Sequence, residues 1–166
     1  MDPRRLLPYL LAVTVCAVLA TGGLVLLTQR PPAPPAPVSA AAATPRDTLA
    51  AWDSRRADAW AAGDVGALRE LYVAGSPTGR ADVRMLAAYV ARGLHVEGLT
   101  TQVLAWEVVE ETPDELTVLV TDRVVGGVVV GEGTSTPLPR DRATTRTVVL
   151  RRVDGDWRMW AVRERT

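Results

Sequence analysis

One uncharged segment near the start of the chain decides how much of it can join a globular core. Residues Leu6–Thr28 (LLPYLLAVTVCAVLATGGLVLLT) contain no charged side chain. As a helix rising about 1.5 Å per residue, this run can cross a hydrocarbon core about 30 Å thick. A cleavable signal peptide has a shorter apolar core, and here the Val18-Leu19-Ala20 cleavage pattern lies inside the run. The segment therefore predicts an uncleaved transmembrane helix over 6–28, with a signal peptide as the alternative.

The charges beside this segment predict its orientation. Residues 1–5 contain two arginines, and only Arg30 follows the segment at once. By the positive-inside rule, the short N-terminus stays in the cytoplasm and the remainder is exported. Residues 29–45 form a linker rich in proline and alanine, which favours an extended spacer. We expect a single-pass protein of the cytoplasmic membrane, bound to the lipid bilayer by its helix, with residues 46–166 forming an extracytoplasmic domain.

The composition of the exported part excludes several classes of function. It has 16 arginines and 18 acidic residues, a balance that does not favour nucleic acid as a partner. The whole chain has one histidine and one cysteine, and Cys16 lies in the apolar segment, so no metal site is expected. The GEG at Gly131–Gly133 opens no helix after a strand, so it does not indicate a dinucleotide site. We expect no cofactor and assign no catalytic residue.

The exported part begins with a helical pattern, TPRDTLAAWDSRRADAWAAG. Thr44 can cap the helix, Pro45 suits its first turn, and Asp47 completes a capping box. Gly63 ends the helix. Its apolar face contains one charged residue, Arg56, which is an imperfection in the pattern.

Two further helices are predicted, VGALRELYV (65–73) and RADVRMLAAYVARG (80–93), and SPTG (76–79) breaks the chain between them. The remainder has the patterning of strands. Two runs flank a turn at Thr112-Pro113-Asp114, and two more flank Asp154-Gly155, a strong hairpin signal. Residues 126–142 read as a strand end and a long loop. Helices followed by an antiparallel meander predict an α+β domain with the helices on one sheet face.

This order of elements resembles the NTF2-like, or SnoaL-like, superfamily. The resemblance covers about 46–164 and is carried by AWAAGDVGALRELY (Ala59–Tyr72), the central strands, and LRRVDGDWRMWAV (Leu150–Val162). It implies a cone in which about three N-terminal helices pack on a curved antiparallel sheet. The whole chain resembles small actinobacterial membrane proteins with one anchor, a Pro/Ala linker and such a domain. These motifs mark a fold and not a reaction.

Asp122 and Arg123 interrupt a run otherwise suited to burial, LTVLVTDRVV. Adjacent strand residues face opposite ways, so these two side chains do not simply pair with each other. A carboxylate enclosed in the cone is a candidate proton-transfer base. In the alternative, Asp122 pairs with a cross-strand arginine such as Arg146 or Arg158, and Arg123 reaches solvent.

The candidate pocket residues are Tyr72, Tyr89, His95 and Asp122. Ketosteroid-isomerase-like relatives use a carboxylate with a tyrosine, so the resemblance implies Tyr72 or Tyr89 as the partner of Asp122. No spacing here matches a known catalytic set. His95, in GLHVEG, is read as a partly buried residue where a strand begins rather than as a base.

The last strand suggests an interface. Residues two apart share a face of a strand, so Trp157 and Met159 face one way, and Trp160 and Val162 face the other. An antiparallel sheet usually exposes polar residues on its open face, so apolar residues there indicate a covered surface. The candidate interface residues are Trp106, Trp160 and Val162. The resemblance implies a homodimer through this face, and the alternative is cover by the glycine-rich loop or the chain termini.

Two functions compete. The first is a membrane-anchored, non-catalytic interaction or scaffold module, whose partner is a second copy or an envelope protein. The second is a small-molecule-binding or isomerase-like protein that uses the cone pocket. A cofactor-free hydrolase ranks last, because no serine lies in the setting of an activated nucleophile.

Overall fold

Three helices begin the part of the chain that the computed structural model describes, residues 43–165. They are α2 (Pro45–Ala62), α3 (Val65–Glu70) and α4 (Pro77–Val90). At the start of α2, the predicted capping box is present. The Thr44 hydroxyl accepts from the Asp47 N–H at 3.2 Å, and the Asp47 carboxylate accepts from the Thr44 N–H at 3.1 Å. The first predicted helix is confirmed, and Gly63 ends it in the left-handed conformation.

Three helix boundaries differ from the prediction, one of them the end of α4, which lies at Val90 rather than at Gly93. SPTG does not break the chain but forms the first turn of α4, because the Ser76 hydroxyl accepts from the Gly79 N–H at 3.0 Å. The second helix ends three residues early. The chain leaves it to pair with the last strand, where Val73 N–H donates to the Met159 carbonyl and Met159 N–H donates to the Leu71 carbonyl. Tertiary pairing therefore overrides the helical pattern there.

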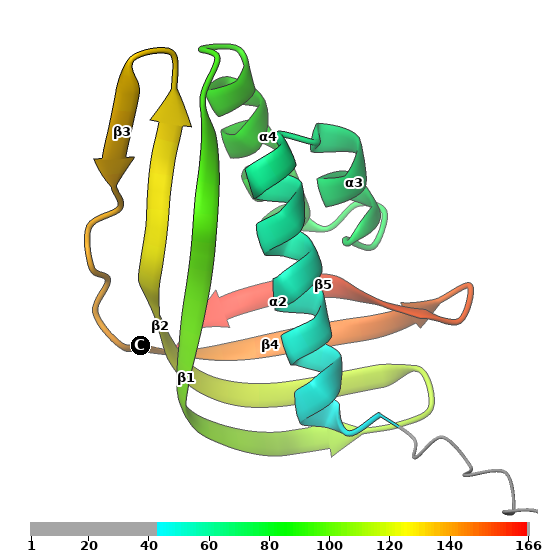
Figure 1. Ribbon diagram of the computed structural model, residues 1–166. Helices are drawn as coiled ribbons and strands as arrows, with labels where there is room; N and C mark the ends of the chain where they lie inside the picture. The colour runs from blue at the N-terminus through cyan, green and yellow to red at the C-terminus, as the bar shows by residue number, and fades with distance from the viewer. Residues whose placement is uncertain (1–42, 166) are drawn as a thin grey trace, which may run out of the picture. The chain divides into compact units, whose positions relative to one another are not determined.

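Five antiparallel strands form one sheet: β1 (His95–Glu111), β2 (Glu115–Gly131), β3 (Thr134–Pro137), β4 (Thr144–Val153) and β5 (Asp156–Glu164). The order is β1-β2-β4-β5, and β3 also pairs with β2. β4 pairs with the first half of β2, and β3 pairs with its second half. β1 and β2 turn sharply at mid-length, so the sheet curves around the helices (Figure 1).

The sharp turn of the sheet coincides with irregular pairing. The β1–β2 register shifts between Glu97 and Thr101, where Gly98 has a φ of 63°. Across the pair, Gly127 has a φ of 147°, and the Leu138 side chain lies where its Cβ would stand. Such a backbone favours glycine. The expected loop over 126–142 was therefore wrong in part, because the strand continues through the glycines and β3 follows.

The core fills the concave side of the sheet, under α2 and α4 (Figure 1). Its most enclosed side chains are Leu68, Leu86, Leu116, Val118, Val120, Leu150 and Met159. The β2 members recur at every second position, as expected for a strand with one buried face. The α+β class and the helices on one sheet face are confirmed.

The closing hairpin turns at Asp154 and Gly155, which have φ values of 55° and 88°. Positive φ at both central residues is the geometry that Asp-Gly predicts. A register shift then places Trp160 as the extra residue of a bulge, because Met159 pairs with Leu150 and Ala161 pairs with Val149.

No helix within residues 43–165 is long and apolar enough to cross a membrane. The predicted transmembrane helix over 6–28 and nearly all of the predicted linker over 29–45 lie outside the described residues, so both stay predictions.

Candidate functional site

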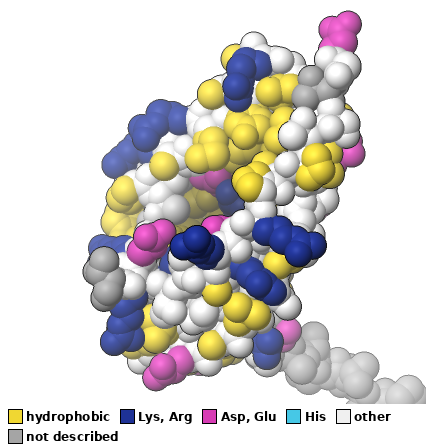
Figure 2. Space-filling model, turned by 90° about the vertical axis from the view of Figure 1, so that its left-hand side faces the viewer, with side chains coloured by type: hydrophobic (Ala, Val, Ile, Leu, Met, Phe, Trp, Pro, Cys, Tyr) yellow, Lys and Arg dark blue, Asp and Glu magenta, His cyan; other side chains and the backbone are white. Residues whose placement is uncertain are grey.

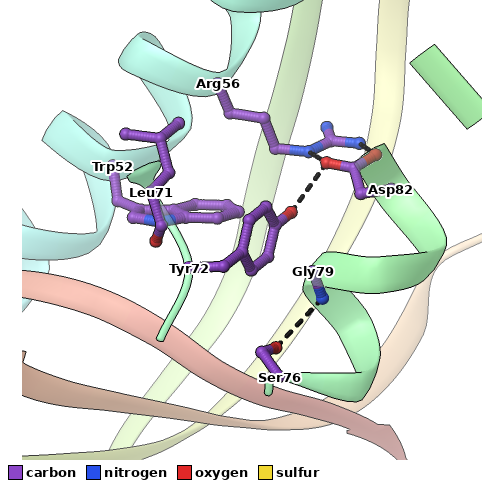
Figure 3. Close-up of polar contacts among 7 residues, drawn as sticks. All are labelled: Trp52, Arg56, Leu71, Tyr72, Ser76, Gly79 and Asp82. Atoms are coloured by element: carbon purple, nitrogen blue, oxygen red, sulfur yellow. Dashed lines mark hydrogen bonds and ion pairs between the residues drawn. The ribbon is translucent and has the colours of Figure 1, made fainter. Parts of the chain in front are cut away.

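The inner side of α2 brings polar groups to the core. Trp52 and Arg56 are four residues apart and therefore share a helix face. Trp52 is buried, and its indole N–H donates to the Leu71 carbonyl at 2.9 Å. The Arg56 side chain extends beside it toward α4 (Figure 3). The imperfection in the apolar pattern of α2 is therefore part of a polar cluster inside the domain.

Arg56 forms a bidentate ion pair with Asp82 of α4. Its Nε and Nη2 donate to Oδ2 and Oδ1, each at 2.7 Å (Figure 3). The Tyr72 hydroxyl donates to the same Oδ2 at 2.7 Å. Asp82 is only 7% exposed, so three donors offset the cost of burying its charge. Burial, followed by the charge of Asp82, raises the pKa of Tyr72, so this phenol acts as a donor.

The position of Tyr72 depends on close packing. A Cβ at residue 79 would lie 2.5 Å from Cγ of Tyr72, so only glycine lets the ring approach α4. The ring also meets Trp52 edge to face, with centroids 5.4 Å apart. Ser76 caps α4 and donates from its hydroxyl to the Trp160 carbonyl at 2.7 Å, which ties the start of α4 to β5.

A second ion pair lies on the sheet. Arg146 of β4 pairs with Asp122 of β2, as one of the sequence alternatives predicted. Asp122 is 7% exposed. The register sets Arg146 opposite Val120, the residue two positions before Asp122 on the same face. Arg123 is exposed and donates to the Gln102 side chain, so the expectation that it reaches solvent is confirmed.

Asp53 is a nearby carboxylate that takes part in neither of these ion pairs. Among residues 43–165 it has no hydrogen-bond or ion-pair partner. Burial raises its pKa to about 6; the nearby charge of Asp122 adds to this rise, and Arg56 and Arg146 oppose it. A partly buried carboxylate that titrates close to neutral pH is a common mark of a functional site.

Two neighbouring cavities meet at Asp53. The cone cavity, about 270 Å³, lies between α2, α4 and the sheet, and its polar lining includes Asp53, Arg56, Tyr72, Asp82, Asp122 and Arg146. The side cavity, about 440 Å³, lies between α2 and β1. Leu49, Asp53, Arg56 and Thr101 line both. One face of the molecule is hollowed, with acidic and basic side chains in its depth and hydrophobic side chains beside them (Figure 2).

Another hollow, about 640 Å³, lies beside α2, α3 and β5. Its charged side chains are exposed, apart from the half-buried Arg158. Its carboxylates are exposed to solvent, whereas the cone cavity holds buried ion pairs and a partly buried unpaired carboxylate. We therefore take the cone cavity and the side cavity together as the candidate site.

The structure brings together two of the four predicted pocket residues. Tyr72 and Asp122 both line the cone cavity. Tyr89 instead packs edge-on against Trp60, with ring centroids 5.4 Å apart. His95 is the first residue of β1 and is half-buried, as expected. Its Nε2 lies 3.2 Å from Oε1 of Glu97. Neither Tyr89 nor His95 lines the cone cavity or the side cavity.

The three predicted interface residues do not share one face. Trp106 pairs with the core residue Val120 and lines the side cavity. The expectation that Trp160 and Val162 face the same way was wrong, because the bulge at Trp160 reverses the alternation. Val162 pairs with Val148 and packs against the core. Trp160 stays outside the core, with the Arg151 guanidinium 4.6 Å from its ring centroid.

The sequence interpretation missed Asp53 and Asp82 and noted Arg56 only as an imperfection. Asp82 had a readable signal, because it lies four residues before the buried Leu86 on the inner face of α4. A charged residue on each of two apolar helix faces indicates a buried pair. Within the described residues, no cluster of histidine, cysteine and acidic side chains could hold a metal ion.

Comparisons with known proteins reveal the fold alone. No family model matches the chain, and no curated protein matches it. The intermembrane space region of chloroplast protein ARC6 is similar, with a TM-score of 0.52, 11% identity and coverage of 72% of this chain and 92% of that one. An NTF2-like protein from Cytophaga hutchinsonii has a TM-score of 0.46, 17% identity and coverage of 72% and 95%.

A third similar structure is an NTF2-like protein of unknown function in nutrient uptake from Rhodospirillum rubrum. Its TM-score is 0.44, its identity 21%, and the coverage 69% of this chain and 93% of that one. The identities are all low, so these likenesses bring no site residue or activity to this chain. The function is therefore inferred from the cavities of this chain.

Proposed function

We propose that this chain is a small-molecule-binding protein whose NTF2-like cone holds its ligand in the two cavities that meet at Asp53. The observation that carries the proposal is the unpaired, partly buried carboxylate in a cavity whose other charges are paired. An isolated buried charge costs stability, and folds keep such costs mainly where function needs them.

The geometry favours binding over the isomerase-like reaction. The proposed base, Asp122, is already paired with Arg146, and the Tyr72 hydroxyl already donates to Asp82. These contacts fix polar side chains along the cavity wall, and the buried Nε of Arg146 has no hydrogen-bond partner among the described residues. A wall of paired side chains suits selective binding, since a ligand need not displace the groups that shape the cavity.

We further propose that the predicted helix over 6–28 anchors this binding domain in the cytoplasmic membrane and that the linker over 29–45 holds it outside. Support comes from the uncharged length of the helix segment and the two arginines before it. In this arrangement, the domain meets solutes from outside the cytoplasm.

The first test blocks the cavities. Thr101 lines both of them, whereas its neighbour Gln102 is exposed on the other side of β1. A small-molecule library is screened against the full-length protein in mild detergent, by the shift in thermal midpoint. We expect hits that stabilise the native protein and Gln102→Trp but not Thr101→Trp, because the new indole fills the space. A library without hits, or hits that stabilise Thr101→Trp equally, would contradict the proposal.

A second function, the interaction module, is favoured by the outer face of the sheet. There the register sets uncharged residues side by side on the convex side, Thr117 opposite Val149, Leu119 opposite Thr147 and Thr121 opposite Thr145. Trp160 stands beside this stripe. A continuous uncharged strip next to an aromatic side chain is a surface that a second copy or an envelope protein can cover.

We expect Trp160→Arg to abolish self-association without unfolding the domain, because the new charge lies in the covered strip. Native mass spectrometry of the full-length protein measures the oligomer, and tryptophan fluorescence checks the fold. The control is Val90→Arg, which introduces the same positive charge at an exposed position on α4 and should leave the oligomer intact. A monomeric native protein, or a Trp160→Arg oligomer of unchanged mass, would refute this face.

A further inference from the structure

The charges that line the cone cavity do not balance. Three carboxylates, Asp53, Asp82 and Asp122, face two guanidinium groups, Arg56 and Arg146. Each guanidinium is already paired, Arg56 with Asp82 and Arg146 with Asp122. The cone cavity therefore has one negative charge in excess, located on Asp53, and the side cavity adds one exposed guanidinium, that of Arg46.

The unpaired group also determines the hydrogen bonds that a ligand can make. Ionised Asp53 only accepts hydrogen bonds, so its partner must be a donor. The donors of Arg56 and Tyr72 that contact Asp82 are already in use, whereas the buried Nε of Arg146 has no hydrogen-bond partner among the described residues. A ligand with its own positive charge and N–H groups satisfies Asp53 and neutralises the cavity. A carboxylate or phosphate would add to the excess charge.

The surroundings of Asp53 favour an organic cation over a metal ion. The apolar lining includes Leu49, Trp52, Met85 and Met159 in the cone cavity, and Trp106 lines the side cavity with Asp53. Aromatic faces attract organic cations, and apolar walls bury a hydrocarbon body. The described residues hold no cluster of three metal-ligating side chains.

We propose that the cone cavity takes a small organic amine, whose ammonium group pairs with Asp53 and whose apolar body lies against the methionine and tryptophan side chains. This inference rests on the proposed small-molecule function and names the chemical class of its ligand. Asp53 is then a specificity-determining residue, because it separates amines from neutral and acidic molecules of the same shape.

The test compares matched probes on the full-length protein in mild detergent. Benzylamine, benzyl alcohol and benzoate share one ring and differ in charge, and cyclohexylmethylamine with its alcohol and carboxylate gives a second set. We expect each amine to bind about tenfold to hundredfold more tightly than its alcohol at neutral pH, measured by calorimetry. In Asp53→Asn the amine should lose this advantage, whereas Asp58→Asn, an exposed site on α2, should keep it.

The pH dependence gives a second readout. Lowering the pH through about 6 protonates Asp53, so amine affinity should fall there while alcohol affinity stays constant. The other ionisable groups facing the cone cavity are Arg56 of α2, Tyr72, Asp82 of α4, Asp122 of β2 and Arg146 of β4, and all of them are held in the pairs described above. On the side cavity, Asp53 also faces the exposed Arg46 of α2, which keeps its charge throughout this pH range.

Each outcome separates this inference from the proposed function. If the alcohols or carboxylates bind as tightly as the amines and Thr101→Trp blocks them, the cavity binds ligands but the amine class is wrong. If none of the probes binds, the amine class is also wrong, and the library screen with Thr101→Trp decides the binding function on its own. An amine preference that survives in Asp53→Asn would overturn the role of Asp53.

Discussion

Replacing Arg56 with leucine is expected to lower the free energy of unfolding by about 3 kcal/mol or more, the usual cost of removing one partner from a buried ion pair. Asp82 would lose both of its 2.7 Å bonds from the guanidinium and keep only the one from the Tyr72 hydroxyl. The guanidinium also lies 5.8 Å from the Trp60 ring centroid, and that contact would be lost as well. The domain should unfold at a markedly lower denaturant concentration.

The measurement is denaturant unfolding followed by tryptophan fluorescence. All five tryptophans lie between residues 52 and 160, so the signal reports on the described domain. Arg55→Leu is the matched control, because Arg55 is exposed on the same helix, and it should change stability by less than about 0.5 kcal/mol.

A double variant shows whether the loss of stability comes from the unpaired charge of Asp82 or from lost packing. In Arg56→Leu combined with Asp82→Asn, neither position of the former ion pair carries a buried charge, and the asparagine can still accept from the Tyr72 hydroxyl. We expect this double variant to recover part of the lost stability. If it is less stable than Arg56→Leu alone, the loss comes from packing and not from an unpaired charge.

Local signals in the sequence predicted local structure well. Thr44 with Asp47 predicted the start of α2, and Asp154-Gly155 predicted the closing turn, because caps and tight turns depend on a few neighbouring residues. The ion pair of Asp122 was also within reach, since strand alternation limits its partners to a few cross-strand positions.

Features that depend on distant contacts were not predicted. The bulge at Trp160 reverses which way Val162 faces, and nothing in the local alternation announces it. The early end of α3 depends on pairing with Met159, far along the chain. The site itself required knowing that α2 and α4 face each other, because only then do Arg56 and Asp82 form a pair and leave Asp53 without one.

We expect Asp53→Asn to make the domain more stable at neutral pH, because the Asp53 carboxylate is partly buried without a partner. The pKa of Asp53 rises from its ordinary 3.8 to about 6 on folding, mainly through burial. Above pH 6 the folded protein therefore carries the Asp53 charge, which water solvates better in the unfolded chain. That difference costs at most about 3 kcal/mol, which asparagine would remove.

The pH dependence follows from the sign of the shift. Because the folded state holds the Asp53 proton more tightly than the unfolded state, this group makes the native protein more stable as the pH falls from about 6 towards 3.8. The gap between Asp53→Asn and the native protein should therefore be widest above pH 6, narrow below it and close near pH 4. Asp58→Asn, on the exposed side of α2, should show no such gap.

The measurement is a series of denaturant-unfolding curves of the full-length native protein and Asp53→Asn at several pH values, which gives the difference in their free energies of unfolding. If Asp53→Asn is less stable than the native protein at pH 8, Asp53 is a structural group with a partner, and the cavity has no unpaired charge to offer a ligand. If it is more stable, the chain retains a carboxylate that harms its own folding. Such a stability cost is typical of a residue kept for binding, and the amine comparison then becomes the direct test of what it binds.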